Sequence, residues 1–248
     1  MDKGSPVNIA KATEELEGTS VEAVLQWVLK IFGDDAAATS SFQSQSVPLL
    51  HLISQHVPDL PILFLDTGFH FPETLEFRDH LVDELGLNVR SLEPRLGHDG
   101  FREKHGKLHQ RDPNMCCYLN KVEPLEDAMV EYDAWVSGIR RDQTENRAGT
   151  PVLQREDDGT LKVCPMVEWT SRDVWTYIDE HDLPKHPLLE EGYLSIGCAP
   201  CTQAPGEGDG ERDGRWTGSD KTECGLHTDF GEDSENETET ENSERDET

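Results

Sequence analysis

Basic residues are scarce in this sequence. The 248 residues contain 22 Lys and Arg against 51 Asp and Glu, which gives a formal net charge of −29. This excess argues against binding to nucleic acid or to an anionic membrane surface, because both are polyanions. Long apolar runs are also lacking, and none approaches the roughly 20 residues of a membrane-spanning helix. Residues 1–8 lack the basic start and apolar core of a secretory signal, so we expect a soluble, cytoplasmic protein.

The acidic excess is concentrated at one end but is not confined to it. Residues 229–248 contain ten acids, one base and one aromatic, so we predict that they form a disordered tail. The net charge of this tail is −9, which leaves −20 for the other 228 residues. A dispersed acidic surface with few lysines is typical of a halophilic organism, whose salty cytoplasm screens self-repulsion. The expected organisation is a lead-in over residues 1–18, one domain over 19–228 and the tail.

Hydrophobic periodicity predicts alternating strands and helices. Short apolar runs predict four buried strands, over residues 36–42, 61–65, 88–92 and 134–139. Capping residues and prolines predict helices over residues 20–32, after residue 46, over 72–85 and 121–131, and from residue 171. The stretch after Pro94 is expected to be irregular, and the chain beyond residue 183 loop-rich. This alternation indicates an α/β fold with a parallel sheet that is flanked by helices.

Two cysteine pairs give the strongest chemical signal. Cys116 and Cys117 are adjacent, and Cys198 and Cys201 form a Cys-x-x-Cys some eighty residues later. Four converging thiolates would suit tetrahedral zinc or an iron–sulfur cluster, although adjacent cysteines are unusual in zinc sites. A zinc staple for the loop-rich part and a redox-active Cys-x-x-Cys are the alternatives. The spacing favours a metal or a cluster without deciding which.

A fifth cysteine, Cys224, stands in the sequence Glu-Cys-Gly-Leu-His, just before the predicted tail. A cysteine beside a flexible segment is well placed to meet first a substrate and then a partner. A nearby His or Arg would lower its pKa and favour the nucleophilic thiolate. The alternative is a surface cysteine without a function.

Two further features indicate anion recognition. Residues 40–46 form a serine-rich turn before a predicted helix, where hydroxyls and backbone N–H groups favour phosphate or sulfate. The signal is weak because the turn contains no glycine. Arginines also cluster in predicted loops, at Arg140, Arg141, Arg147, Arg212 and Arg215. Arginine pairs well with phosphate and sulfate oxygens, but ordinary surface ion pairs are an equal alternative.

Taken together, these segments resemble the phosphosulfate reductase family, and within it the cluster-containing adenylylsulfate (APS) reductases. The matching stretches are residues 41–43, 65–68, 71–74, 116–117, 121–122, 124–125, 132–135, 138–143, 192–193, 195–201 and 223–227. The resemblance covers residues 35 to 228. It implies an adenine nucleotide α-hydrolase-like, Rossmann-like fold and one [4Fe–4S] cluster per chain. With this resemblance, a cluster is favoured over zinc as the group that the four cysteines bind.

The resemblance also implies roles for individual residues. Cys116, Cys117, Cys198 and Cys201 match the cluster ligands, and Cys224 matches the catalytic cysteine. Lys121 and His227 match residues that assist catalysis. The implied substrate-binding residues are Ser41, Phe42, Gln43, Asp66, Thr67, Gly68, Arg140, Arg141, Arg212 and Arg215.

The implied chemistry has two steps. The Cys224 thiolate attacks the sulfur of APS and AMP leaves, which gives an S-sulfocysteine. A dithiol then releases sulfite. The only Cys-x-x-Cys belongs to the cluster and no thioredoxin-like domain follows Cys224, so the expected reductant is an external thioredoxin. Assembly into a homo-oligomer stays open.

Two departures from the family pattern stand out. Gln43 occupies a position where the family often has glycine, and Cys164 matches no family cysteine, so we expect it to be a buried small residue. Three rival functions stay open: reduction of the 3′-phosphorylated substrate (PAPS), a non-catalytic iron–sulfur or zinc protein, and an ATP pyrophosphatase of the same fold. The last is disfavoured because the turn lacks a glycine-rich loop.

The acidic composition predicts a dependence on salt. Activity and stability should fall in dilute buffer, where self-repulsion among the carboxylates is least screened. Activity and thermal unfolding measured across a series of KCl concentrations test this. Full activity and stability in dilute buffer would contradict a halophilic origin and leave the reductase assignment untouched.

Overall fold

Six strands form one mixed sheet in the computed structural model, which describes residues 7–206, 212–217, 221 and 223–226. The strand order is β3-β2-β1-β4-β6-β5, and every pair is parallel except β5 with β6. The strands are β1 (Ala36–Thr39), β2 (Ile62–Leu65), β3 (Val89–Leu92), β4 (Ala134–Ser137), β5 (Leu153–Arg155) and β6 (Leu161–Val163).

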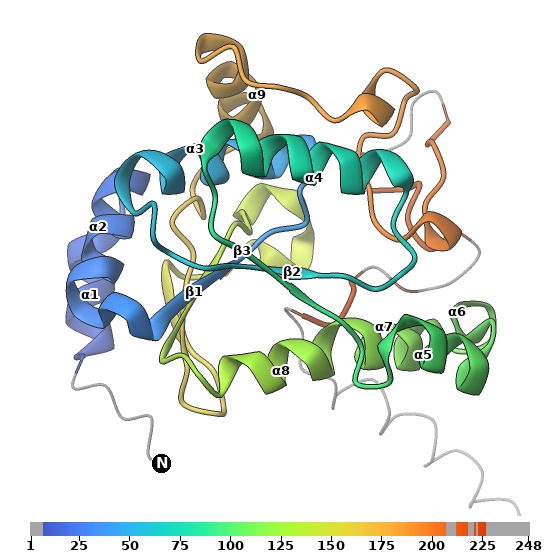
Figure 1. Cartoon of the computed structure of the whole chain (residues 1–248). Helices are drawn as coiled ribbons and strands as arrows, with labels where there is room; N and C mark the ends of the chain where they lie inside the picture. The colour runs from blue at the N-terminus through green and yellow to red at the C-terminus, as the bar shows by residue number, and fades with distance from the viewer. Residues whose placement is uncertain (1–6, 207–211, 218–220, 222, 227–248) are drawn as a thin grey trace, which may run out of the picture.

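Helices cover both faces of the sheet (Figure 1). They are α1 (Ile9–Leu16), α2 (Val21–Phe32), α3 (Val47–His56), α4 (Pro72–Leu85), α5 (Gly97–His105), α6 (Leu108–Arg111), α7 (Pro113–Cys117), α8 (Glu123–Met129) and α9 (Ser171–Glu180). The larger apolar core lies on the side of α2, α3, α4 and α9, and a smaller cluster lies beneath α8. In the central strand β1, three alanines at 0–1% exposure let helices approach from both sides.

The four predicted strands are confirmed, each within its expected range, and so is the α/β architecture. Ser20 caps α2 by accepting a hydrogen bond from the N–H of Ala23, and Gly86 ends α4 with a φ of +65°. The chain after residue 183 is loop-rich in its described part. Cys164 is fully buried, as expected.

Three expectations about local structure were wrong. Residues 9–16 form α1, which buries Ala12 and Leu16 in the main core instead of being a loose lead-in. The stretch after Pro94 contains α5 to α7. The sheet is not wholly parallel, because β5 and β6 form an antiparallel hairpin. These elements are short, so tertiary packing decides them and sequence periodicity does not reveal them. The predicted tail, residues 229–248, lies outside the described residues.

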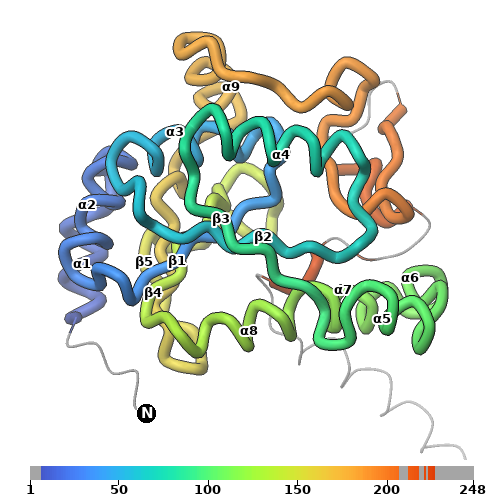
Figure 2. Tube along the Cα trace, viewed as in Figure 1, coloured from blue at the N-terminus to red at the C-terminus, as the bar shows by residue number. Residues whose placement is uncertain are grey.

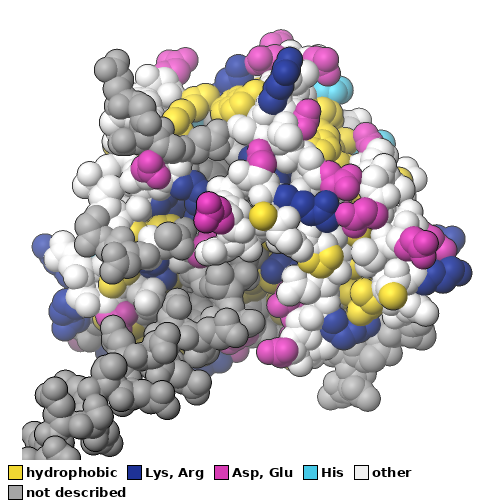
Figure 3. Space-filling view, turned by 180° about the vertical axis from the view of Figure 1, so that it is seen from behind, with side chains coloured by type: hydrophobic (Ala, Val, Ile, Leu, Met, Phe, Trp, Pro, Cys, Tyr) yellow, Lys and Arg dark blue, Asp and Glu magenta, His cyan; other side chains and the backbone are white. Residues whose placement is uncertain are grey.

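Acidic and basic side chains both lie on the surface of the protein (Figure 3). On the face shown in Figure 3, carboxylates are scattered among basic side chains and do not gather into one patch. Among the described residues, no helix is both long and apolar enough to span a bilayer.

His186 ties the loop-rich C-terminal part to the rest of the fold. Its backbone N–H donates to Ser44 Oγ at 2.9 Å, and its Nδ1 accepts from the N–H of Leu188 at 3.2 Å. Nε2 therefore carries the proton and donates to Thr74 Oγ1 at 3.0 Å. Both ring nitrogens are used by the neutral form, and burial lowers the pKa of His186 from 6.5 to about 4.

This buried histidine predicts a loss of stability in mild acid. The unfolded chain takes up the proton below pH 6.5 and the folded chain only near pH 4, so the free energy of unfolding should fall between these values. The contribution of His186 to this fall is at most about 3 kcal/mol. Urea unfolding at several pH values measures it, and His186→Gln should flatten the slope. The exposed His80, changed to Gln, is the control, and an unchanged slope in His186→Gln would contradict the account.

Candidate active site

The main cavity lies at the carboxyl ends of the central strands. It is lined by Thr39 to Ser41 at and after the end of β1, by Ser137 to Ile139 at and after the end of β4, and by C-terminal residues that include Cys224. With its open mouth it encloses about 1240 Å³. The chain runs from β1 outward to β2 and β3 in one direction and to β4 in the other, so this is the switch point where parallel sheets usually bind ligands.

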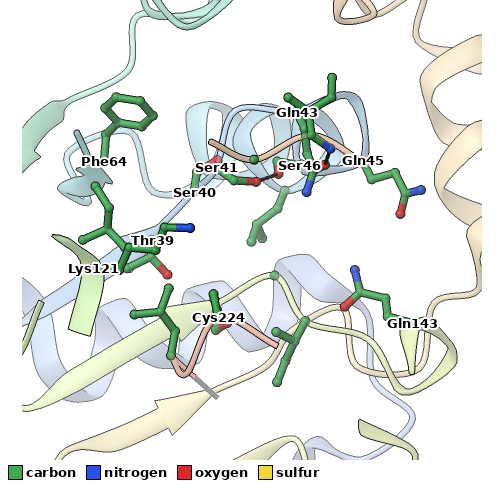
Figure 4. A pocket seen from close by; sticks show the side chains of 18 of the residues that line it. Thr39, Ser40, Ser41, Gln43, Gln45, Ser46, Phe64, Lys121, Gln143 and Cys224 are labelled. Atoms are coloured by element: carbon green, nitrogen blue, oxygen red, sulfur yellow. Dashed lines mark hydrogen bonds between the residues drawn. The ribbon is translucent and has the colours of Figure 1, made fainter. Parts of the chain in front are cut away.

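The serine-rich turn forms one wall of this cavity. Ser40 Oγ accepts from the N–H of Phe42 at 3.1 Å, and the hydroxyls of Ser41 and Ser46 lie 3.2 Å apart (Figure 4). The ring of Phe42 does not line the cavity; it is buried edge-on against Phe64, and its φ of +51° is unusual for a non-glycine residue. Its place in the core thus holds the turn in shape.

Gln43 performs a different role from the glycine that the family pattern suggested. Its Oε1 accepts a hydrogen bond from the N–H of Ile196 at 2.9 Å. Gln43 lines the cavity and also ties the turn to the segment that contains Ile196.

Four cationic side chains line the same cavity: Lys121, Arg147, Arg212 and Arg215. Burial opposes the charge of Lys121, yet the nearby thiols of Cys198, Cys224 and Cys117 outweigh it and raise the pKa of Lys121. Burial lowers the pKa of Arg212, against the opposing effect of Glu223. Among the described residues, no acceptor reaches the buried Nε atoms of Arg147 and Arg215. Because such N–H groups are costly to leave unpaired, they suit the oxygens of a bound anion.

Cys224 lies across the cavity from the serine turn, with Lys121 and Gln143 at its sides (Figure 4). The thiol is half-buried. The structure therefore brings Cys224, Lys121, Arg212, Arg215 and the serine-rich turn together around one space.

The two cysteine pairs line a second, smaller cavity next to the first. Cys116 and Cys117 end α7, whose first turn is capped by Asp112, and Cys198 and Cys201 flank a short 3₁₀ turn. These segments are far apart in sequence, yet α7 and the orange chain beyond residue 187 lie at the same end of the sheet (Figure 2). Lys121 and Arg215 line both cavities and so connect them.

The thiols in this second cavity interact with one another. Burial, with the charges of Cys117, Cys198 and Cys201, raises the pKa of Cys116 to about 12, and burial with Cys198 raises that of Cys201 to about 11. Asn120 Nδ2 lies 3.7 Å from Cys116 Sγ, and Thr67 Oγ1 lies 3.4 Å from Cys198 Sγ. Such donors are typical partners of metal-bound sulfur.

The second cavity is lined by thiols, the side chains that bind iron–sulfur clusters. Within the described chain, no three His, Cys, Asp or Glu side chains are placed to hold one metal ion. Four cysteine thiols around one cavity match the number and type of ligands of a [4Fe–4S] cluster.

Several expected substrate-binding residues do not line the main cavity. Asp66, Thr67 and Gly68 form a turn beside the cysteines, in which Asp66 Oδ1 accepts from the N–H of Gly68. Arg140 is buried and bonded to Asp142 and Gln45.

Arg141 also lies away from the cavity. It pairs with Glu17 at the end of α1 and with Glu168. These ion pairs give Arg140 and Arg141 structural roles. His227 lies outside the described residues.

Sequence reasoning undervalued other residues of the site. Arg147 belonged to the basic cluster and Glu223 precedes Cys224, but neither was assigned to the site. Gln143 lines the cavity, but in the sequence it was noted only as part of the motif that begins with Arg140 and Arg141 and was not assigned to the site. Asn120 gave no signal, because an isolated asparagine in a helix is unremarkable.

A cavity lined by cations at the switch point of a parallel sheet, with a cysteine facing it, defines an α/β enzyme class that acts on anionic nucleotides. The chain belongs to the phosphoadenosine phosphosulfate reductase family, whose reductase domain matches residues 35–204.

Named relatives agree with this assignment. The chain is 45% identical to an adenosine 5′-phosphosulfate reductase of Streptomyces coelicolor, over 88% of this chain and 92% of that one. It is 40% identical to the protein of that name from Halalkalibacterium halodurans, over 92% of this chain and all of that one.

Among solved structures, the phosphate complex of Candida auris PAPS reductase is similar. Its TM-score is 0.70 at 28% identity, over 79% of this chain and 97% of that one. An FMN adenylyltransferase of Candida glabrata in complex with ATP shares the fold, with a TM-score of 0.55 at 16% identity, over 81% of this chain and 66% of that one.

Proposed function

We propose that this chain reduces APS to sulfite and AMP in assimilatory sulfate reduction, with Cys224 as nucleophile and an external thioredoxin-like dithiol as reductant. The observation that carries the proposal is the cavity in which Cys224 meets Lys121, Arg212 and Arg215. The relatives named APS reductases, at 40–45% identity over most of the chain, support the same substrate.

The cavity offers complementary surfaces to the parts of APS. Its apolar lining suits adenine and comes from Leu49, Leu50, Ile53, Phe64, Ile139 and Met166. The hydroxyls of the serine turn and the N-terminus of α3 suit the phosphate. The phosphate in the Candida auris structure is consistent with an anion-binding role in the family.

In the first step, the Cys224 thiolate attacks the sulfur of APS. A bond forms between Cys224 Sγ and that sulfur, and the bond from sulfur to the bridging oxygen breaks with both electrons on AMP. Lys121, Arg212 and Arg215 neutralise charge on the sulfate and phosphate oxygens, and Lys121 lies close enough to Cys224 for the two charges to interact. The product is an S-sulfocysteine.

In the second step, a thiolate of the reductant attacks Cys224 Sγ and releases sulfite. The mixed disulfide is then resolved by the second thiol of the same dithiol, which leaves Cys224 reduced and the partner oxidised. Cys198 and Cys201 are unsuited to this task if they bind a cluster, so the electrons come from a separate molecule.

Cys116, Cys117, Cys198 and Cys201 would hold one [4Fe–4S] cluster. A bound cluster supplies a fixed charge beside Lys121 and tethers α7 to the C-terminal segment. Lys121 and Arg215, which line both cavities, hold their positive charges between this site and the substrate.

Arg215 depends on a neighbouring glycine. Its guanidinium lies 4.5 Å from the ring centre of Trp216, and Nη1 donates to the carbonyl of Ile196 at 3.3 Å. A Cβ at Gly197 would overlap the guanidinium of Arg215. Only glycine leaves room for the guanidinium here.

Gly197→Ala should therefore displace Arg215 without unfolding the chain, because a long side chain can swing aside. The loss of a charge-assisted contact to the sulfate should raise the Kd for APS by at least about tenfold. Equilibrium dialysis with Cys224→Ser protein, which cannot turn over, measures it. Gly149→Ala is the control because a Cβ there meets open space. Equal affinity in the Gly197 variant would refute this role of Arg215.

The function itself is tested by anaerobic purification, iron and sulfide analysis, and assays of sulfite release from APS and PAPS with thioredoxin. We expect four irons and four sulfides per chain, faster reaction with APS, and no turnover by Cys224→Ser. Cys164→Ala, which changes a fully buried cysteine, should keep its iron and its activity. Zinc in place of iron would refute the cluster, faster turnover of PAPS would establish the rival substrate, and unchanged turnover in Cys224→Ser would remove the nucleophile.

A further inference from the structure

Glu223 directly precedes the proposed nucleophile, and its side chain is only 5% exposed. Its Oε2 accepts from Arg147 Nη2 at 2.7 Å and from Arg212 Nη2 at 3.3 Å. Its Oε1 accepts from Thr144 Oγ1 at 3.3 Å. Three donors, two of them cationic, make this carboxylate a specific anchor for the C-terminal segment.

The partners of Glu223 belong to a well-braced loop that follows β4. Arg147 Nη1 also donates to Gln143 Oε1, which in turn accepts from the backbone N–H of Arg140 at 3.0 Å. Arg140 is itself buried and paired with Asp142 at 3.0 Å. The anchor is thus fixed to the sheet through the loop over residues 140–147.

A second anchor lies on the other side of Cys224. Leu226 packs against the smaller apolar cluster beneath α8, as do Leu65 and Tyr132. Gly225 has a φ of +88°, which lets the chain turn sharply between the two anchors. Cys224 is therefore held by an ionic contact one residue before it and an apolar contact two residues after it.

We propose that Glu223 is a positioning residue that latches Cys224 over the cavity, and that opening of this ionic latch exposes Cys224 to the reductant. The inference rests on the role proposed for Cys224. One sulfur must meet a substrate inside the cavity and then a protein thiol at the surface, so it needs two positions. A buried ion pair suits this requirement, because it fixes geometry while adding little net stability, and its charges regain water when it opens.

Glu223→Gln tests the latch, because it removes the charge and keeps the size. Without substrate, alkylation of Cys224 by iodoacetamide, followed by peptide mass spectrometry, should accelerate by at least about tenfold. Single-turnover formation of S-sulfocysteine from APS should slow by a similar factor. Release of sulfite from preformed S-sulfocysteine by thioredoxin should not slow, which separates positioning from general damage.

Matched variants make the test specific. Glu131→Gln removes the carboxylate of an exposed ion pair with Arg90 and should change none of the three rates. Thr144→Val removes one hydrogen bond of the latch and should accelerate alkylation of Cys224 by a smaller factor. This variant also tests the latch if Glu223→Gln folds poorly. The double variant Arg147→Gln/Glu223→Gln should form S-sulfocysteine no more slowly than the slower of the two single variants, because both substitutions break the same contact.

Equal alkylation rates of Cys224 in the wild type, Glu223→Gln and Thr144→Val would overturn the latch. Equal slowing of both chemical steps would overturn it as well. Alkylation needs no substrate, so faster alkylation in Glu223→Gln supports the latch even if wild-type protein forms no S-sulfocysteine from APS, a result that would refute only the proposed function.

Discussion

Mutual repulsion among four cations around one cavity is the constraint on which the rest of the site depends. Lys121 and Arg147 are buried, and Arg212 and Arg215 are half-buried. Burying such charges is costly unless opposite charge is near. The described structure supplies it from Glu223, and a doubly negative substrate would supply more.

This arrangement explains how a chain with a net charge of −29 can bind an anion. Among the described residues, the acids other than Glu223 are not buried, so water and salt screen them, whereas the cavity concentrates cations in a poorly solvated space. Coulombic attraction is stronger there, so a few arginines outweigh the distant carboxylates. The overall charge therefore says little about the ligand of the site.

Sequence patterns were sufficient for the main architecture, and they singled out the cysteines that the structure places around two adjoining cavities. Strongly apolar runs such as residues 61–65 and capped helices such as α4 carry their own local signals. The cysteine pairs and Cys224 together form a motif that is specific to very few kinds of site. What could not be predicted depends on tertiary structure: α1 is defined by the core that it covers, and Phe42 turns inward because Phe64 gives it a place to pack.

The arginines illustrate the same limit most clearly. Arg141 and Arg147 looked alike in sequence, but one pairs with Glu17 at the surface and the other reaches Glu223 inside. Only the folded chain distinguishes them, because the partners lie more than seventy residues away.

The most direct test of the account is the intact mass of the protein after anaerobic incubation with APS in the absence of any thiol. The account predicts the addition of one sulfonate, located on the peptide that contains Cys224 and removed by thioredoxin with release of sulfite. An unchanged mass, or a sulfonate on any other cysteine, would contradict it.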